Sequence, residues 1–327
     1  SDRGLQYIDA RVTSPTDTTI VTGDVLGEYL VTTPDSLDRT IRVRLAGPFG
    51  RVFNVTNPQM PTTPTITISV PDGGSAFRAF YFDNGNSLAS ERDAYYSAMI
   101  SHDYIKTVEP GFNLLDYQMP IFVEVAGSCN AFWNGFGVNF FVEDDRCTNT
   151  ARSATTVMHE YAHGITDFMY RPFFPSGAMH EGFSDYYAAT ITDQPIVGLG
   201  FRKSDPNSFI RRIDVDRISP DNLTGEVHND GLVIASALWN IREVLGREKT
   251  DELWHFACYG FSDNFDDYVF DVLETDDDDG NVYNGTPNFT FLANTFRHHG
   301  IGDYAVHISH VPTPDTEDIL KVFPITA

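Results

Sequence analysis

The chain has 327 residues, 41% hydrophobic and 13% aromatic, which fits a globular protein of about two or three compact units and not a disordered one. Its 46 acidic residues outnumber its 22 basic residues and give a formal net charge of −24, which argues against nucleic acid and anionic membranes as partners. No apolar run approaches the roughly 18 residues that a membrane span needs. A surface with this excess of negative charge is consistent with an exported protein. The alternative is that the charge serves only to keep the protein soluble.

The first part of the chain, residues 1–75, has the pattern of short β-strands. Alternating runs rich in Val, Ile and Thr, such as TIRVRLAGP and TPTITISVP, are separated by Gly, Pro and Asp. We expect a small β-sandwich-like domain here, with a boundary near PDGG at residues 71–74.

The remainder is mainly helical. Helical periodicity over 90–108 precedes two strand-like segments, MPIFVEVAG and NAFWNGFGVNFFVE. Helices are then predicted over 153–170, 178–192 and 230–245, the last one ended by Gly246. This order predicts an α+β fold with three units: the β-rich residues 1–75, a lobe over 76–195 and a mainly helical lobe over 196–327.

Three cysteines allow at most one internal disulfide. Cys129 and Cys147 flank a segment with the pattern of a hairpin, so we favour that pair and an oxidising compartment, and we expect secretion. The alternative is three free thiols in a cytosolic protein.

The helix over 153–170 carries the chemical signal of the sequence. On a helical wheel its apolar side chains share one arc, while His159 and His163 lie on the opposite side, about 40° apart. Two histidines one turn apart can bind one metal ion, and Glu160 beside the first can accept a proton from metal-bound water. HEYAH therefore matches the H-E-x-x-H zinc motif with Glu160 as general base. A surface histidine pair without metal is the alternative.

The next predicted helix supplies a third ligand. Glu181 can complete a His₂Glu site, and Asp185 one turn later can accept the free ring N–H of a ligand histidine. Asp185 and His180 are competing ligand candidates, and His180 ranks lower because it points about 100° away from Glu181.

These segments resemble the thermolysin-like and fungalysin-like zinc peptidases. The resemblance covers roughly residues 77–300 and implies a two-lobed metallopeptidase: a mixed sheet with an edge strand and a zinc helix, then a helical lobe. SCNAFWNG resembles the substrate-binding edge strand, which gives Asn130 and the backbone of Ala131 that role. GFRKSDP and GEVHNDG resemble the segments whose arginine contacts the substrate and whose histidine contacts the tetrahedral intermediate, here Arg202 and His228.

The chain departs from this family at two points. The family tyrosine that contacts the intermediate is replaced by Phe174, with Tyr170 nearby. The aspartate that orients the histidine is also absent from its expected position, and Glu226 or Asp221 are candidates to substitute for it. The resemblance further implies that residues 1–75 are an accessory or pro-type domain.

Two polar segments near the end of the chain have less specific interpretations. Asp276 and Asp278 in TDDDDGN have the oxygen chemistry of a calcium site, and equally that of a solvated acidic turn. The histidines of RHHG, residues 297–300, fall at a predicted helix end, where a cationic side chain suits the helix dipole.

The sequence thus predicts a secreted zinc endopeptidase that acts on peptides or proteins. One alternative is a zinc aminopeptidase, although NAFWNG lacks the carboxylate that such enzymes use to hold the substrate amino terminus. The other is a peptidase-like binding module that has lost catalysis.

Overall fold

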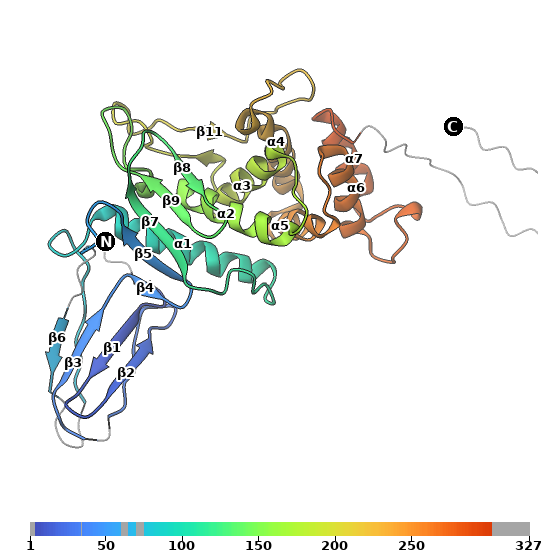
Figure 1. The fold of residues 1–327 in the computed structure, drawn as a ribbon. Helices are drawn as coiled ribbons and strands as arrows, with labels where there is room; N and C mark the ends of the chain where they lie inside the picture. Colours follow the sequence, from blue (N-terminus) through green and yellow to red (C-terminus); the bar gives the residue numbers. More distant parts are fainter. Residues whose placement is uncertain (1–3, 34, 60–64, 70–74, 303–327) are drawn as a thin grey trace, which may run out of the picture.

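The structure, a computed structural model, describes residues 4–33, 35–59, 65–69 and 75–302. Strands dominate the first part and helices the second, which confirms the predicted α+β class (Figure 1). Within the described residues, no helix has both the length and the apolar character needed to cross a membrane.

The N-terminal sheet is antiparallel, with the strand order β2-β1-β3-β6. Its strands are β1 (Asp9–Thr13), β2 (Thr18–Thr22), β3 (Arg39–Val43) and β6 (Thr65–Ile68). Ala10, Val12 and Val43 are buried while their neighbours in the strands are more exposed, as expected of a sheet with one covered face. Within the described residues, these four strands of the predicted β-sandwich-like domain lie in one antiparallel sheet.

The second sheet has five strands in the order β4-β5-β7-β9-β8. They are β4 (Ala46–Gly47), β5 (Gly50–Asn54), β7 (Met119–Val125), β8 (Ala131–Trp133) and β9 (Val138–Phe141). β5 pairs in parallel with β7, and Gly50 lies opposite Met119. The range 1–75, predicted as one unit, therefore contributes strands to both sheets.

A helix lies close against these two paired strands. α1 (Ala89–Val108) packs over β5 and β7, and a Cβ atom at Gly50 would lie 2.7 Å from Met99 Cε of α1. Glycine at this position thus lets the helix lie directly on the strand. Val52, Met99 and Ile121 are buried at this contact and join the main core.

The helical half follows in chain order (Figure 1). Its helices are α2 (Ala154–Tyr170), α3 (Gly177–Thr192), α4 (Val227–Leu245), α5 (Arg247–Ala257), α6 (Phe265–Asp276) and α7 (Phe289–His298). The two-residue strands β10 (Ile196–Val197) and β11 (Arg211–Arg212) pair with each other between α3 and α4. α3 packs against both α2 and α4, so the three helices form the centre of this half.

Candidate metal centre

α2 is held against the edge strand of the five-stranded sheet. Val157, Tyr161 and Ile165 are fully buried on its apolar side, as the periodicity predicted. On another side Trp133 of β8 packs on Gly164, where a Cβ atom would lie 3.1 Å from the indole ring. Trp133 Nε1 also donates a hydrogen bond of 3.0 Å to Asp167. These contacts fix the distance between β8 and the helix that carries His159 and His163.

Two histidines of α2 and one glutamate of α3 converge on a common point. His159 Nε2 lies 3.1 Å from Glu181 Oε2, and His163 Nε2 lies 3.6 Å from Glu181 Oε1. One donor atom from each of the three residues lies within 4.8 Å of the others. The structure therefore brings together the three side chains that the sequence predicted as metal ligands.

The donor atoms fit a divalent cation. Glu181 Oε2 is buried and accepts no hydrogen bond from the described residues, so a bound ion would satisfy it. Burial lowers the pKa of His159, but Asp185 and Glu181 outweigh this and raise it to about 10. The two carboxylates therefore favour a positive charge at this ring, either a proton or a bound cation that displaces the proton. Two imidazoles and one carboxylate form the ligand set of a catalytic zinc site with one open position.

A carboxylate contacts the other ring nitrogen of His159. Asp185 Oδ1 lies 2.8 Å from His159 Nδ1, on the ring edge opposite Glu181. Asp185 is fully buried, and Arg211 of β11 donates two hydrogen bonds to it. Burial raises the pKa of Asp185, but Arg211 and His159 outweigh this and hold it well below its usual range. Asp185 thus remains an acceptor for the ring N–H of His159, the contact that the sequence predicted for it.

The second histidine has different neighbours. His163 Nδ1 lies 2.6 Å from His180 Nδ1 and 3.0 Å from Ser184 Oγ. His180 therefore contacts the ring edge of His163 that faces away from Glu181, and it is not one of the three converging side chains. Burial lowers the pKa of both imidazoles, which favours the neutral form that His163 needs as a metal ligand.

Glu160 lies next to the ligand group without belonging to it. Its side chain is buried and lines the same cleft as the three converging residues. Burial raises the pKa of Glu160 to about 7; His159 opposes this shift and Glu181 adds to it. A carboxyl group with a pKa near neutrality can accept and return a proton, which is what general acid–base catalysis requires.

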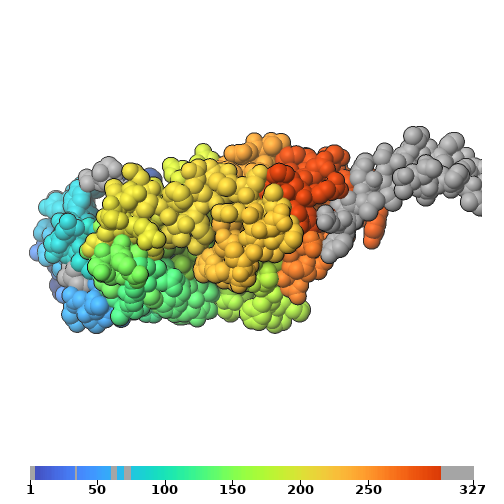
Figure 2. Space-filling view, turned by 90° about the horizontal axis from the view of Figure 1, so that it is seen from above, coloured from blue at the N-terminus to red at the C-terminus, as the bar shows by residue number. Residues whose placement is uncertain are grey.

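A cleft of about 1110 Å³ lies above this centre. One wall is β8, whose outer edge is unpaired in the sheet, with Asn130 and Ala131 on the cleft as predicted. The opposite wall comes from the segment after α3 and from the start of α4. In the space-filling view, the yellow surface of that segment lies beside the green surface that includes β8 and β9 (Figure 2).

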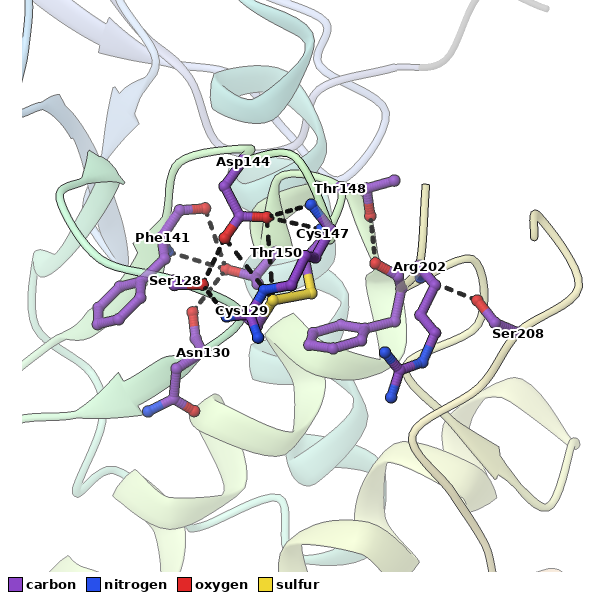
Figure 3. The surroundings of a disulfide bond; sticks show 12 residues. Ser128, Cys129, Asn130, Phe141, Asp144, Cys147, Thr148, Thr150, Arg202 and Ser208 are labelled. Carbon is purple, nitrogen blue, oxygen red and sulfur yellow. Dashed lines mark hydrogen bonds between the residues drawn. A yellow bond between two sulfur atoms is a disulfide. The ribbon is translucent and has the colours of Figure 1, made fainter. Parts of the chain in front are cut away.

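Arg211, Arg212 and Arg217 line this cleft, whereas Arg202, the arginine predicted to contact the substrate, does not. Arg202 does not belong to the cleft lining; it is exposed beside the Cys129–Cys147 disulfide, where its N–H donates to Ser208 Oγ at 2.8 Å (Figure 3). Its backbone is also bridged to Cys147. Arg211 lines the cleft, but the sequence around Arg211 contains no motif that would have favoured it over Arg202 as the substrate-binding arginine. The sequence signal for it was only the pair of arginines in FIRRID.

His228 stands at the first turn of α4, facing the metal centre. Its Nε2 lies 3.4 Å from Glu181 Oε1, and its Nδ1 lies 2.6 Å from Glu226 Oε1. Glu226 also caps α4 by accepting from the backbone N–H groups of His228 and Asn229. Of the two carboxylates considered as partners of His228, the structure therefore selects Glu226 and not Asp221.

No tyrosine lines the cleft in the part of the chain that the structure describes. Phe174 is exposed and lies outside the cleft lining. Tyr170 is fully buried, with its ring against Phe261. Neither side chain can take the place of the tyrosine that the resemblance implies.

The predicted disulfide between Cys129 and Cys147 is present, and Cys258 is a buried free thiol. Asp144 organises the loop around the disulfide: it accepts hydrogen bonds from the N–H groups of Arg146 and Cys147 and from Ser128 (Figure 3). Since Cys129 directly precedes Asn130, the bridge anchors the start of β8.

The two aspartates predicted as calcium ligands are not brought together. Asp276 is buried and accepts hydrogen bonds from Thr286 and Asn288, with Lys249 at 3.2 Å. Its oxygens are therefore already paired with the protein, and it anchors the segment before α7. Asp278 is exposed and groups with Asp277 and Asp279, which is an ordinary arrangement for an acidic turn.

A comparison with solved structures finds a metalloproteinase with a similar fold. No protein-family profile matches the sequence. The precursor of protealysin, a metalloproteinase from Serratia proteamaculans, superposes with a TM-score of 0.60 at 15% sequence identity, over 77% of this chain and 87% of that one. At this identity the likeness concerns the fold alone. The chain thus has a metalloproteinase-like fold, with His159, His163 and Glu181 grouped beside its cleft.

Proposed function

We propose that the protein is a secreted zinc-dependent endopeptidase. The observation that carries this proposal is the convergence of His159, His163 and Glu181 on one point beside the buried Glu160, in a cleft walled by an unpaired strand edge. The unpaired edge of β8 can bind an extended peptide by adding it as a further strand. The peptide backbone would then lie across the metal centre. The disulfide and the net charge of −24 support export.

The residues of the chain supply the proton transfer. Zinc, when bound by His159, His163 and Glu181, supplies a Lewis acid that polarises the scissile carbonyl and lowers the pKa of bound water. Glu160 accepts a proton from that water and returns it to the leaving amine. Its raised pKa matches both halves of this transfer near neutral pH.

The chain also supplies donors for the developing negative charge. In its imidazolium form His228 would donate from Nε2 toward the centre, while Nδ1 donates to Glu226 and fixes the orientation of the ring. Such a donor contributes about 3 kcal/mol to the transition state. Arg211 lines the cleft while its guanidinium binds Asp185, so we assign it the substrate contact that the resemblance gave to Arg202.

The cleft favours an endopeptidase over an aminopeptidase. The carboxylates among its lining residues are Glu160, Glu181 and Glu226. The first is the proposed base, the second a metal ligand and the third the partner of His228. None of the three is left to bind the free amino terminus of a substrate.

Digestion of casein with and without a zinc chelator tests the proposal. We expect cleavage that the chelator abolishes and added zinc restores, and equal cleavage of unblocked and N-acetylated peptides. Glu160→Gln should retain zinc and lose activity. Glu143→Gln, a surface carboxylate paired with Lys203, is the matched control and should cleave normally. Zinc binding without any cleavage by the unmodified protein would favour the binding-module alternative.

A further inference from the structure

A second group of metal-ligand side chains lies behind the wall of the cleft. Asp216 follows β11, and His298 and His299 end α7, 82 and 83 residues later in the chain. His298 Nε2 lies 2.7 Å from Asp216 Oδ2, and His299 Nε2 lies 4.0 Å from Asp216 Oδ1. One donor atom from each of the three residues lies within 4.8 Å of the others. None of the three belongs to the cleft lining.

His299 is held in the orientation that a metal ligand needs. Its side chain is fully buried, and Nδ1 lies 2.8 Å from the carbonyl oxygen of Arg217. A carbonyl oxygen only accepts, so Nδ1 carries the proton and donates it. The lone pair is therefore on Nε2, which faces Asp216. A backbone carbonyl that fixes the tautomer of a ligand histidine is a usual support in metal sites.

Asn240 of α4 occupies the space between the ligands. Its Nδ2 lies 2.8 Å from Asp216 Oδ1 and 3.0 Å from His299 Nε2. Rotation of this amide by 180° would direct Oδ1 at the same point. Asn240 could then act as a fourth ligand beside the two imidazoles and the carboxylate.

The backbone around the group is tightly packed. Ser219 N–H donates to the carbonyl oxygen of His299 at 2.9 Å. Gly300 has a φ of +69°, and a Cβ atom there would lie 1.9 Å from the carbonyl oxygen of Ser219. The two segments that carry the ligands are thus already fixed to each other, so binding an ion needs side-chain rearrangement alone: the Asn240 amide must rotate and His298 must move away from Asp216 Oδ2. Adjacent donors of a tetrahedral ion with bonds of about 2.1 Å lie about 3.4 Å apart, so His298 Nε2 would move away from Asp216 Oδ2 and His299 Nε2 would approach Oδ1.

We propose that Asp216, His298 and His299 form a second binding site for a divalent transition-metal ion such as Zn²⁺, distinct from the catalytic centre. Two imidazoles and a carboxylate suit Zn²⁺, Co²⁺ or Ni²⁺ better than Ca²⁺, which prefers oxygen ligands. The site clamps the end of α7 to the segment after β11. Val215 and Arg217 line the cleft on either side of Asp216, so the clamp holds that wall of the cleft from behind.

Metal analysis of the full chain after equilibration with Zn²⁺ and desalting tests the proposal. We expect two equivalents of zinc in the unmodified protein and one in His298→Ala and in Asp216→Asn. Glu181→Ala should also hold one, because it loses the catalytic ion and keeps the second. Asp214→Asn, a neighbouring carboxylate paired with Arg212, is the matched control and should hold two. Zn²⁺ should raise the unfolding temperature of Glu181→Ala and not that of the double variant Glu181→Ala/His298→Ala.

Two results would overturn the second site. One is a single equivalent in the unmodified protein that Glu181→Ala removes. The other is full zinc content in both His298→Ala and Asp216→Asn. Asp216→Asn keeps the size of the side chain, so it tests the site even if His298→Ala does not fold. The catalytic proposal fails separately: a single equivalent lost in His298→Ala and kept in Glu181→Ala would support the second site alone.

Discussion

Arg211 donates two hydrogen bonds to Asp185, from Nε to Oδ2 at 2.6 Å and from Nη2 to Oδ1 at 2.7 Å. The other face of this buried carboxylate meets His159 Nδ1 at 2.8 Å. A planar guanidinium thus holds the acceptor that orients the first proposed ligand. The wall of the cleft that carries Arg211 is thereby linked to α2, which carries His159 and His163.

The first prediction concerns this link. Arg211→Lys keeps the charge but loses the planar pair of donors, so Asp185 and the ring of His159 lose their fixed orientation. We expect zinc affinity to fall by about 10- to 100-fold, as for other outer-sphere changes. Competition with a chromophoric chelator measures it. Arg212→Lys, at an exposed pair with Asp214, is the control; an equal loss there would show that the effect is not specific to Asp185.

The second prediction separates His228 from the metal ligands. His228→Ala should lower kcat/KM by about 10²- to 10³-fold because one donor to the transition state is lost. Its zinc content should match that of the unmodified protein. Loss of metal in this variant would mean that His228 acts as a ligand.

The third prediction tests whether Glu226 acts through His228. The Glu226 carboxylate lies 2.6 Å from His228 Nδ1, and the contact with His228 holds the pKa of Glu226 at about 2. Glu226→Gln should lower kcat/KM in the unmodified background and have little further effect in the His228→Ala background. Equal losses in both backgrounds would give Glu226 an independent role, for example in capping α4.

The sequence was sufficient to predict the proposed metal ligands because the patterns that indicate them are each local to one helix. Helical periodicity alone places His159 and His163 one turn apart and Glu181 one turn before Asp185. The choice between Arg202 and Arg211 depends on the path of the loop between them, which periodicity does not determine. The same limit applies to β5, whose parallel pairing with β7 joins residues about 70 positions apart, since Gly50 lies opposite Met119.

Solvent exposure was the other property that the sequence could not provide. Asp276 belongs to a run of four aspartates that looks uniformly solvated, yet it is buried and paired with Lys249 and Asn288. His299 resembles an exposed helix-end histidine, and it is fully buried against Arg217. In both cases the partner belongs to another segment of the chain, which only the tertiary fold brings into contact.

The fourth prediction concerns the disulfide. Cys129 and Cys147 are 18 positions apart in the chain, and closing a loop of this length corresponds to about 3 kcal/mol of unfolding free energy in the chain-entropy description. Reductant should lower the unfolding free energy of the unmodified protein by about this amount, as measured by urea denaturation. The double variant Cys129→Ser/Cys147→Ser should be insensitive to reductant. Sensitivity of the double variant would point instead to the remaining thiol, Cys258.

The fifth prediction is a pH dependence of stability that originates at His255, far along the chain from the proposed catalytic residues. The imidazole is fully buried between aromatic rings, among them Phe112 and Tyr259, and its Nε2 lies 2.6 Å from Glu109 Oε2. Burial lowers the pKa of His255, and the contact with Glu109 opposes this only in part. The folded-state pKa therefore lies below the value of about 6.5 expected in the unfolded chain. Below that value the unfolded state binds more protons, so the unfolding free energy falls as the pH decreases through 6.5.

A comparison with His255→Gln isolates this contribution. Glutamine can still donate to Glu109 but does not titrate, so the unfolding free energy of the unmodified protein minus that of the variant should decline between pH 7.5 and pH 5. Urea denaturation at a series of pH values measures the difference. In Glu109→Gln the opposing carboxylate is gone, so the decline should be steeper. A difference that instead grows as the pH falls would mean that Glu109 outweighs burial and that His255 is protonated in the folded protein.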